Sequence, residues 1–254
     1  MRLTSHMVKT QKIDYLRHHS TPWHKHTSGQ LYWLEQGVMV IETLQAQWHV
    51  TAGTLGWFPS GIEHRAWFPG SVKGSSLYLS PASCALFPSV PGIYGADHFV
   101  FALLGRLELN ANQSLPSDYL CSLLTLLGHE IKQLPQWPLE LTLPSDRRAR
   151  NVAEELLRHP ATRLGQAQLA QQWGLSVRNL SRLFTQQTGL SFSQWRQQAK
   201  IVSSLQWITA GLPISEVAER SGYSNISAYI EAFRLRFGKT PGQFKVSSCQ
   251  PSAG

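Results

Sequence analysis

The stretch "ISEVAERSGYSNISAYIEAFRLRFGKTPGQF", residues 214–244, combines the local signals of a helix-turn-helix unit. Ala218 is small, as needed where two helices cross closely, and Gly222 suits the left-handed backbone that ends a helix. Asn225 can accept backbone N–H bonds at the start of a second helix. Two aromatic residues then fall on the inward face of that helix, Tyr229 and Phe233. The segment therefore predicts two short helices joined by a tight turn.

The same pattern occurs about 48–49 residues earlier, in "LAQQWGLSVRNLSRLFTQQTGLS", residues 169–191. Ala170, Gly174 and the candidate cap Ser176 repeat the order of small residue, glycine and helix start. Between the copies, residues 191–211 carry an apolar stripe at helical spacing, which predicts one long connecting helix. The internal repeat predicts two helix-turn-helix units, at 167–188 and 214–237, with a rigid connector between them.

Charge is distributed unevenly along the 254 residues. Residues 1–144 contain nine basic and nine acidic side chains, whereas residues 145–254 contain fourteen and six, so the whole excess of +8 lies in the second part. This favours a polyanionic partner such as nucleic acid, although a solvated basic surface gives the same total. No long apolar run, secretory leader or cysteine framework is evident, so we expect a cytoplasmic protein without a membrane span.

The first part of the chain indicates β-structure followed by helices. From Val38 to Val50 apolar residues occupy alternate positions, as in a half-buried strand, and glycines and prolines punctuate the surrounding sequence. Residues 116–134 carry a helical leucine stripe in which Leu120, Leu127 and Leu134 repeat every seven residues. This stripe can pack either on its own domain or on the same helix of a second subunit, and the sequence leaves both open.

These features predict an α+β chain of two domains. Three prolines between Pro135 and Pro144 exclude a helix there and indicate a linker. The helical part then begins with Ser145 as the candidate cap. The expected division is a first domain at 1–135 (sandwich or barrel at about 15–80, helices at about 97–134), a linker at 136–144, a helical domain at 145–245 and a tail at 246–254.

The region from about 145 to 245 resembles the DNA-binding domain of the AraC/XylS family of bacterial transcription regulators. The matching positions include Ala218, Gly222, Phe233, Phe237, Gly238 and Pro241. The resemblance implies two recognition helices in adjacent major grooves of double-stranded DNA. It implies DNA-binding positions at Val177, Arg178, Asn179, Ser181, Arg182, Asn225, Ile226, Ser227, Ile230 and Glu231. Phosphate-contact candidates, with solvated charges as the alternative, are Arg196, Lys200, Arg234, Arg236 and Lys239.

The two recognition helices differ in their hydrogen-bonding side chains. Arg182 is the best candidate for a guanine contact, since an arginine can reach O6 and N7 together. Glu231 stands where family members often have arginine or another polar residue, and its carboxylate would repel phosphate. Ile226 and Ile230 beside it cannot donate hydrogen bonds. We therefore predict that the first recognition helix carries most of the sequence specificity.

Residues 15–80 resemble the paired motifs of the cupin barrel, with "HKHTSGQ" at 24–30 and "GTLGWFPSGIEH" at 53–64. In metal-binding cupins three histidines and an acid coordinate a divalent ion. Here His24, His26 and His64 match, but Gln30 replaces the acid, which lowers the expected affinity. Three imidazoles can still hold a divalent transition metal such as Zn, Ni, Fe or Co. The alternative is that the histidines are polar walls of a pocket for an organic ligand.

The combined resemblances imply a sequence-specific transcription regulator controlled by a small-molecule or metal effector in the barrel, with no catalytic residues. RNA polymerase would be a partner if the protein is an activator, and a homodimer through the first domain is a candidate. One alternative is a metal-dependent cupin enzyme with an accessory helical domain. Another is a constitutive DNA-binding protein whose barrel only dimerises. The tandem helix-turn-helix units and the incomplete ligand set favour the regulator.

Overall fold

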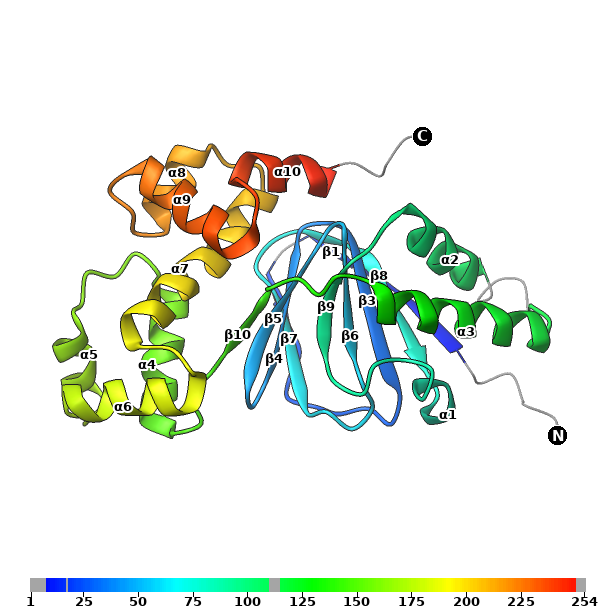
Figure 1. Cartoon of the computed structure of the whole chain (residues 1–254), viewed down its shortest axis with the longest axis horizontal. Helices are drawn as coiled ribbons and strands as arrows, with labels where there is room; N and C mark the ends of the chain where they lie inside the picture. Colours follow the sequence, from blue (N-terminus) through cyan, green and yellow to red (C-terminus); the bar gives the residue numbers. More distant parts are fainter. Residues whose placement is uncertain (1–7, 17, 110–114, 250–254) are drawn as a thin grey trace. The chain divides into compact units, whose positions relative to one another are not determined.

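The computed structural model describes residues 8–16, 18–109 and 115–249 (Figure 1). The chain forms two compact units. One runs to Thr43 and continues through Trp48–Leu139, and the other comprises Leu44–Gln47 and Glu140–Val246. The first unit is rich in strands and the second consists almost entirely of helices, which confirms the predicted α+β class with two domains.

The strands form two five-stranded sheets, and they lie in the first unit except at residues 46–47 and 140–142, which belong to the second. The first sheet has the order β1 (Val8–Tyr15), β8 (Val72–Leu79), β3 (Gly29–Gln36), β6 (Thr54–Phe58) and β9 (Gly92–Gly95). The second has the order β10 (Glu140–Thr142), β5 (Ala46–Thr51), β4 (Val38–Thr43), β7 (His64–Phe68) and β2 (His19–Ser20). The sheets face each other, with the rings of Trp48 and Phe58 5.4 Å apart. The strands extend beyond the expected span of about 15–80 at both ends.

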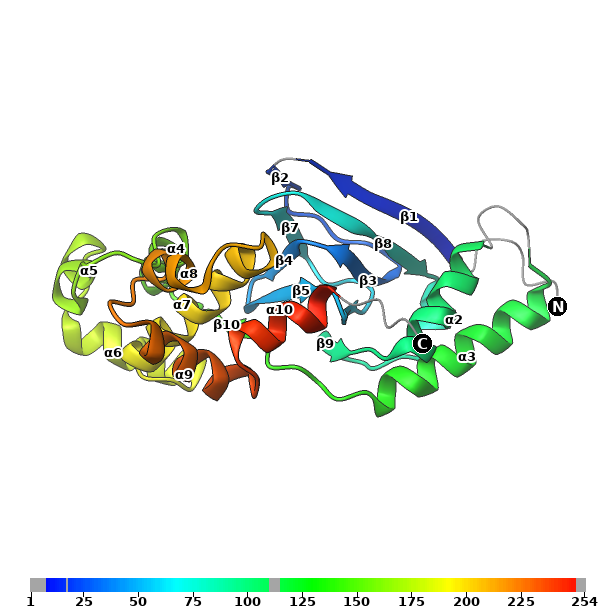
Figure 2. The same ribbon diagram turned by 90° about the horizontal axis from the view of Figure 1, so that it is seen from above.

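Helices α2 (His98–Glu108) and α3 (Ser117–Gln133) lie beside the first sheet (Figures 1 and 2). Alternate strand residues face these helices and form one buried core with them: Leu31, Trp33, Leu55, Trp57, Leu77, Leu79, Val100, Leu104, Leu124, Leu127 and Ile131. Leu120 and Leu127 are buried in this core and Leu134 packs against it. Each fully buried leucine stabilises the fold by about 1.5–3 kcal/mol. The leucine stripe therefore packs on its own domain.

Residues 38–50 form a hairpin, and the prediction of one half-buried strand is wrong. β4 ends at Thr43, β5 begins at Ala46, and Leu44 at the turn is 63% exposed. Every residue of both strands is buried. Thr43 lies opposite His64, whereas Trp48 contacts Phe58. The residues that point between the two sheets therefore have odd numbers before the turn and even numbers after it. An alternating pattern alone does not reveal a turn that exchanges the two faces.

The second unit contains two helix-turn-helix units, as predicted. Its helices are α4 (Arg147–Arg158), α5 (Gln166–Gln172), α6 (Val177–Thr188), α7 (Phe192–Thr209), α8 (Ile214–Arg220), α9 (Ile226–Phe237) and α10 (Pro241–Cys249). The predicted turn chemistry is confirmed: Ser176 and Asn225 cap α6 and α9 through backbone N–H groups. Gly174 and Gly222 adopt φ of 66° and 75°, the left-handed region that favours glycine. The long connector α7 packs against α4, α6, α8 and α9.

The two turn glycines differ in their surroundings, and substitution should separate them. An added Cβ at Gly174 meets nothing within 4 Å, whereas at Gly222 it would lie 2.8 Å from the Ala161 Cα and 3.2 Å from the Pro160 carbonyl oxygen. Backbone strain alone should make Gly174→Ala destabilising by about 1–2 kcal/mol. We expect Gly222→Ala to lower the free energy of unfolding by more, measured by urea denaturation. Equal losses would show that the backbone around Ala161 yields freely.

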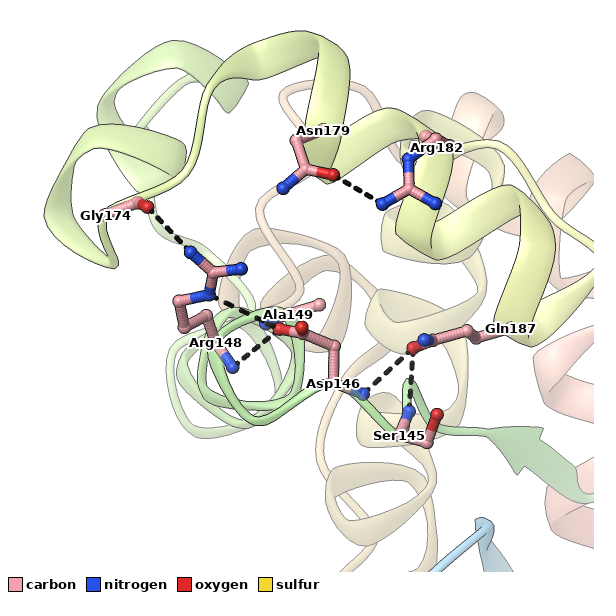
Figure 3. A network of polar contacts seen from close by, with 8 residues as sticks. All are labelled: Ser145, Asp146, Arg148, Ala149, Gly174, Asn179, Arg182 and Gln187. Atoms are coloured by element: carbon pink, nitrogen blue, oxygen red, sulfur yellow. Dashed lines mark hydrogen bonds and ion pairs between the residues drawn. The ribbon is translucent and has the colours of Figure 1, made fainter.

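The start of the second unit differs from the expectation in detail. The segment 136–144 contains the strand β10, because its prolines exclude a helix but not a strand at a sheet edge. Asp146, not Ser145, caps α4: its Oδ1 accepts the backbone N–H groups of Arg148 at 2.9 Å and Ala149 at 3.2 Å (Figure 3). The Gln187 side chain accepts the N–H groups of residues 145 and 146. At the other end α10 enters the expected tail, of which residues 250–254 lie outside the described residues.

Candidate functional site

Helix α6 presents a polar face opposite its buried stripe. Leu180, Leu183 and Phe184 are buried, as predicted. Val177, Arg178 and Arg182 are exposed, and Asn179 and Ser181 are partly buried. The first helix-turn-helix unit therefore offers two arginines to a partner, one at its start and one a full turn later. Both belong to the set of candidate DNA-binding residues.

The Arg182 guanidinium is held in place by two side chains of its own helix. It donates to Asn179 Oδ1 at 2.8 Å (Figure 3) and to Gln186 Oε1 at 2.6 Å. Such bonds fix the direction of the planar guanidinium before any partner arrives, which lowers the entropy lost on binding. Ser181 is used differently: its hydroxyl accepts from Gln166 Nε2 at 2.7 Å. Ser181 therefore braces α5 against α6, and its place among the DNA-binding residues stays a prediction.

Helix α9 offers fewer hydrogen-bonding groups on its exposed face. Ile226 is 44% exposed, Ser227 is exposed and Ile230 is partly buried. Asn225 uses its side-chain oxygen to cap the helix, accepting from the N–H group of Ser227 at 2.8 Å. Glu231 and Arg234 are paired at 3.1 Å, so the acid is partly neutralised within the helix. This distribution supports the prediction that α6 is the more specific reader.

Three of the five phosphate-contact candidates donate to backbone carbonyls within the helical unit. Arg196 donates to Leu164 O at 2.7 Å and also to Thr162 O. Lys200 donates to Gly222 O at 2.9 Å. Arg236 donates to Glu140 O. Burial lowers the pKa of all three cations, and Arg196 further lowers the pKa of Lys200. These contacts indicate bracing of loops and turns; Arg234 and Lys239 remain the better phosphate candidates, of which Arg234 is exposed.

The Arg196 brace predicts a loss of stability when it is removed. Arg196→Ala leaves the carbonyls of Thr162 and Leu164 without their charged donor, which should lower the free energy of unfolding by about 1.5–3 kcal/mol. Gln172→Ala, at an exposed position of α5, serves as control and should change it by less than about 0.5 kcal/mol. Urea denaturation measures both. An Arg196→Ala protein of unchanged stability but weakened DNA binding would restore the phosphate-contact assignment.

The structure brings the three predicted histidines of the first unit together. His24 and His64 are paired through their backbones, with N–H to O distances of 2.9 and 2.8 Å. The ring centroids lie 4.7 Å apart for His24 and His26, 4.6 Å for His24 and His64 and 5.4 Å for His26 and His64. One nitrogen from each ring lies within 4.8 Å of the others. Within the described part of the chain these three residues form a metal-competent histidine cluster.

Hydrogen bonds determine which nitrogens face the centre of the histidine cluster. His24 Nδ1 lies 2.8 Å from Pro22 O, and His64 Nδ1 lies 2.9 Å from Ile62 O. A carbonyl can only accept, so each Nδ1 carries the proton and each neutral ring keeps a free lone pair on Nε2. The Nε2 atoms of His26 and His64 are buried without a partner among the described residues. The same arrangement orients histidines that bind metals.

The lowered pKa values of His26 and His64 favour neutral rings at these two residues. Burial lowers the pKa of His26, and the neighbouring His24 adds to this effect. Burial also lowers the pKa of His64; its bond to Ile62 opposes the shift, and His24 and His26 reinforce it. Neutral imidazoles are the metal-binding form. His24, His26 and His64 would hold a divalent metal, since one nitrogen of each ring lies within 4.8 Å of the others.

Gln30 is buried, but its side-chain oxygen is already used. The Tyr32 hydroxyl donates to Gln30 Oε1 at 2.7 Å, and both side chains lie on the face of the first sheet opposite the helices. This bond uses one of the two lone pairs of Gln30 Oε1, which makes the uncharged amide a weaker candidate for a fourth ligand than a carboxylate at the same position. Tyr78, which meets His26 edge-on at 5.7 Å, was not identified from the sequence. Its only signal was its place in an alternating strand, since tyrosines of this kind are common in sheets.

Two family profiles match the chain. The helix-turn-helix domain profile matches residues 169–246, and the AraC-like ligand binding domain profile matches residues 13–159, more than half of the chain. The chain belongs to the AraC family. It is a DNA-binding transcription regulator with an N-terminal ligand-binding domain, as the resemblance implied. The cupin-like description of the first unit agrees with this assignment.

Characterised relatives of this AraC family member are bacterial regulators. The transcriptional regulator NimR of Escherichia coli is 28% identical over 225 residues, which is 89% of this chain and 82% of NimR. The regulator RipA of Corynebacterium glutamicum is 36% identical over 102 residues, 40% of this chain and 31% of RipA. Fatty acid-bound ToxT of Vibrio cholerae aligns over the whole of both chains with a TM-score of 0.42 and 11% identity. No described helix combines the length and apolar character needed to cross a membrane.

Proposed function

We propose that this AraC family member is controlled by an effector bound at the histidine cluster, with a divalent transition metal held by His24, His26 and His64. One observation carries the proposal: the buried Nε2 lone pairs of His26 and His64 converge with an imidazole of His24 and have no partner among the described residues. Buried polar atoms without partners are costly, and a bound ion is one of the known reasons for which they occur. A bound metal satisfies them.

Control requires that the effector binds two states of the protein unequally. A molecule in the first unit changes DNA occupancy only by the difference in its affinity for the DNA-competent and DNA-free states. The coupling between such sites is typically about 5–150-fold in affinity. RNA polymerase and a second copy of the chain are the partners through which this change would reach transcription. Because its target is the chromosome, we place the protein in the cytoplasm.

The competing function is a metal-dependent enzyme with an accessory helical domain. The metal-competent group contains histidines alone among the described residues, and Gln30 is bonded to Tyr32. No carboxylate stands in the cluster to act as a general base. The characterised relatives are transcription regulators, which supports the regulatory function over the catalytic one.

A salt-dependent DNA-binding assay tests the regulatory function. The DNA that flanks the protein's own gene is compared with random DNA of equal length between 50 and 200 mM salt. We expect affinity to fall steeply with salt for both, and a preference for the flanking DNA of about 10³-fold or more to remain. Equal affinity for both DNAs, or none, would remove sequence-specific regulation and restore the enzyme as the leading candidate.

A further inference from the structure

A cavity lies next to the histidine cluster in the first unit. Its volume is about 630 Å³, within the range of pockets that bind small organic molecules. The polar residues in its wall are Lys9, Gln11, His26, Ser28, Tyr78 and Ser80. His26 belongs both to this wall and to the histidine cluster. A molecule in the cavity therefore lies beside one of the three histidines of the cluster.

Strand register connects the far wall of the cavity to the histidines. Lys9 of β1 lies opposite Tyr78 of β8, Tyr78 lies opposite Gln30 of β3, and Gln30 lies opposite Phe58 of β6. Residues directly opposite one another share a face of the sheet, and neighbouring strands are about 4.8 Å apart. Phe58 in turn stacks on His64, with ring centroids 6.2 Å apart. One row of side chains thus leads from a lysine to the cluster.

The charges along this row have one sign. Lys9 provides the single formal charge among the described residues that line the cavity. The histidine cluster contains no carboxylate, because Gln30 occupies the position of the acid in the cupin pattern. A divalent ion bound by three neutral imidazoles would keep a net charge of +2 in a partly buried site, which is costly without a counter-charge. Cavity and cluster therefore both favour a negatively charged ligand.

We propose that the effector is a small organic carboxylate, whose carboxylate group takes the open coordination position of a metal at His24, His26 and His64. The remainder of the molecule occupies the cavity beside Lys9. This inference rests on the proposed function, because it assumes the metal. It also gives the uncharged Gln30 a role. A glutamate at this position would partly neutralise the metal and compete with the carboxylate of the ligand.

Cobalt(II)-loaded full-length protein provides the test, because the visible spectrum of the metal reports its ligands. Acetate, benzoate and succinate are titrated against the neutral probes acetamide and benzamide, with calorimetry as a second readout. We expect at least one carboxylate to change the spectrum and to bind about tenfold or more tightly than its amide counterpart. Gln30→Glu should keep the cobalt and weaken that binding about tenfold.

A lysine pair on the same strand provides the matched control. Lys9→Gln should weaken carboxylate binding several-fold without changing the cobalt content. Lys12→Gln should not, because Lys12 points to the other face and pairs with Glu108 at 3.1 Å. Cobalt binding without any preference for carboxylates over amides would overturn this inference alone. Failure of cobalt to bind at all would overturn both this inference and the metal in the proposed function.

Discussion

Replacing His24 and His26 together by alanine is expected to abolish metal binding. Protein purified without chelator should carry about one equivalent of a divalent transition metal per chain, and the double variant close to none, measured by elemental analysis. Two of three converging imidazoles are lost, and the remaining His64 is a single monodentate ligand. The Nδ1 bond of His64 to Ile62 O at 2.9 Å should keep its ring in place but cannot replace the missing donors.

The control for this prediction is His129→Ala, which removes an exposed histidine of α3 outside the cluster. Its metal content should equal that of the unchanged protein. Because His24 and His64 also pair through their backbones, the fold of the double variant should be checked by circular dichroism. Equal metal content in the folded double variant and the unchanged protein would show that His24 and His26 do not bind the metal.

Arg182→Ala is expected to remove most of the operator preference. Loss of a bidentate arginine–guanine contact costs about 1–3 kcal/mol, equivalent to roughly 5–150-fold in affinity for the operator. Affinity for random DNA should change little, since the guanidinium is assigned to a base and not to phosphate. Its bonds to Asn179 at 2.8 Å and Gln186 at 2.6 Å should make the loss larger than for a freely moving side chain.

The comparison is made with Ile226→Ala and Ser227→Ala on α9, at positions that are also exposed. We expect both to weaken operator binding by less than Arg182→Ala, because α9 offers few donors that read base edges. Fluorescence anisotropy with operator and random DNA measures all three variants. If Arg182→Ala keeps the operator preference while the α9 changes abolish it, the ranking of the two helices is wrong.

The helical second unit could be predicted best, because its signals act over a few residues. The capping of α6 by Ser176 and of α9 by Asn225 depends only on the adjacent turn, and both were predicted. Gly174 and Gly222 were likewise placed in left-handed turns, which the structure confirms. The second unit could therefore be divided into helices from sequence. The cap of α4 is Asp146 and not the predicted Ser145. Both residue types can cap a helix, and the sequence alone does not show which of two neighbours bonds to the backbone N–H groups.

The sheets were harder to predict because strand register is decided by residues far apart in the chain. The alternating pattern at residues 38–50 concealed a hairpin, and interior positions changed parity at Leu44. The row from Lys9 to Phe58 depends on the pairing of four strands and has no local signature. The same holds for the Tyr32 bond that occupies Gln30. The three histidines were found only because a known family pattern supplied their spacing.

The sequence also gave no sign that basic side chains would brace loops and turns of the second unit. From the sequence, Arg196, Lys200 and Arg236 were candidates for phosphate contacts, with solvated charges as the alternative, and their contact with phosphate stays a prediction. The structure adds that each donates to a backbone carbonyl at a distant position in the chain. Carbonyl partners carry no sequence signal, so a bracing arginine and a DNA-contacting arginine look the same until the fold is known.

A single titration tests whether the histidine cluster controls DNA occupancy. Operator affinity is measured by anisotropy at fixed salt for metal-free and metal-loaded protein, beside the His24→Ala/His26→Ala variant. We expect metal to change the affinity of the unchanged protein by about 5–150-fold, operator DNA to change the metal affinity by the same factor, and the variant to show neither effect. Identical operator affinities with and without metal would contradict the claim and favour a constitutive DNA-binding protein.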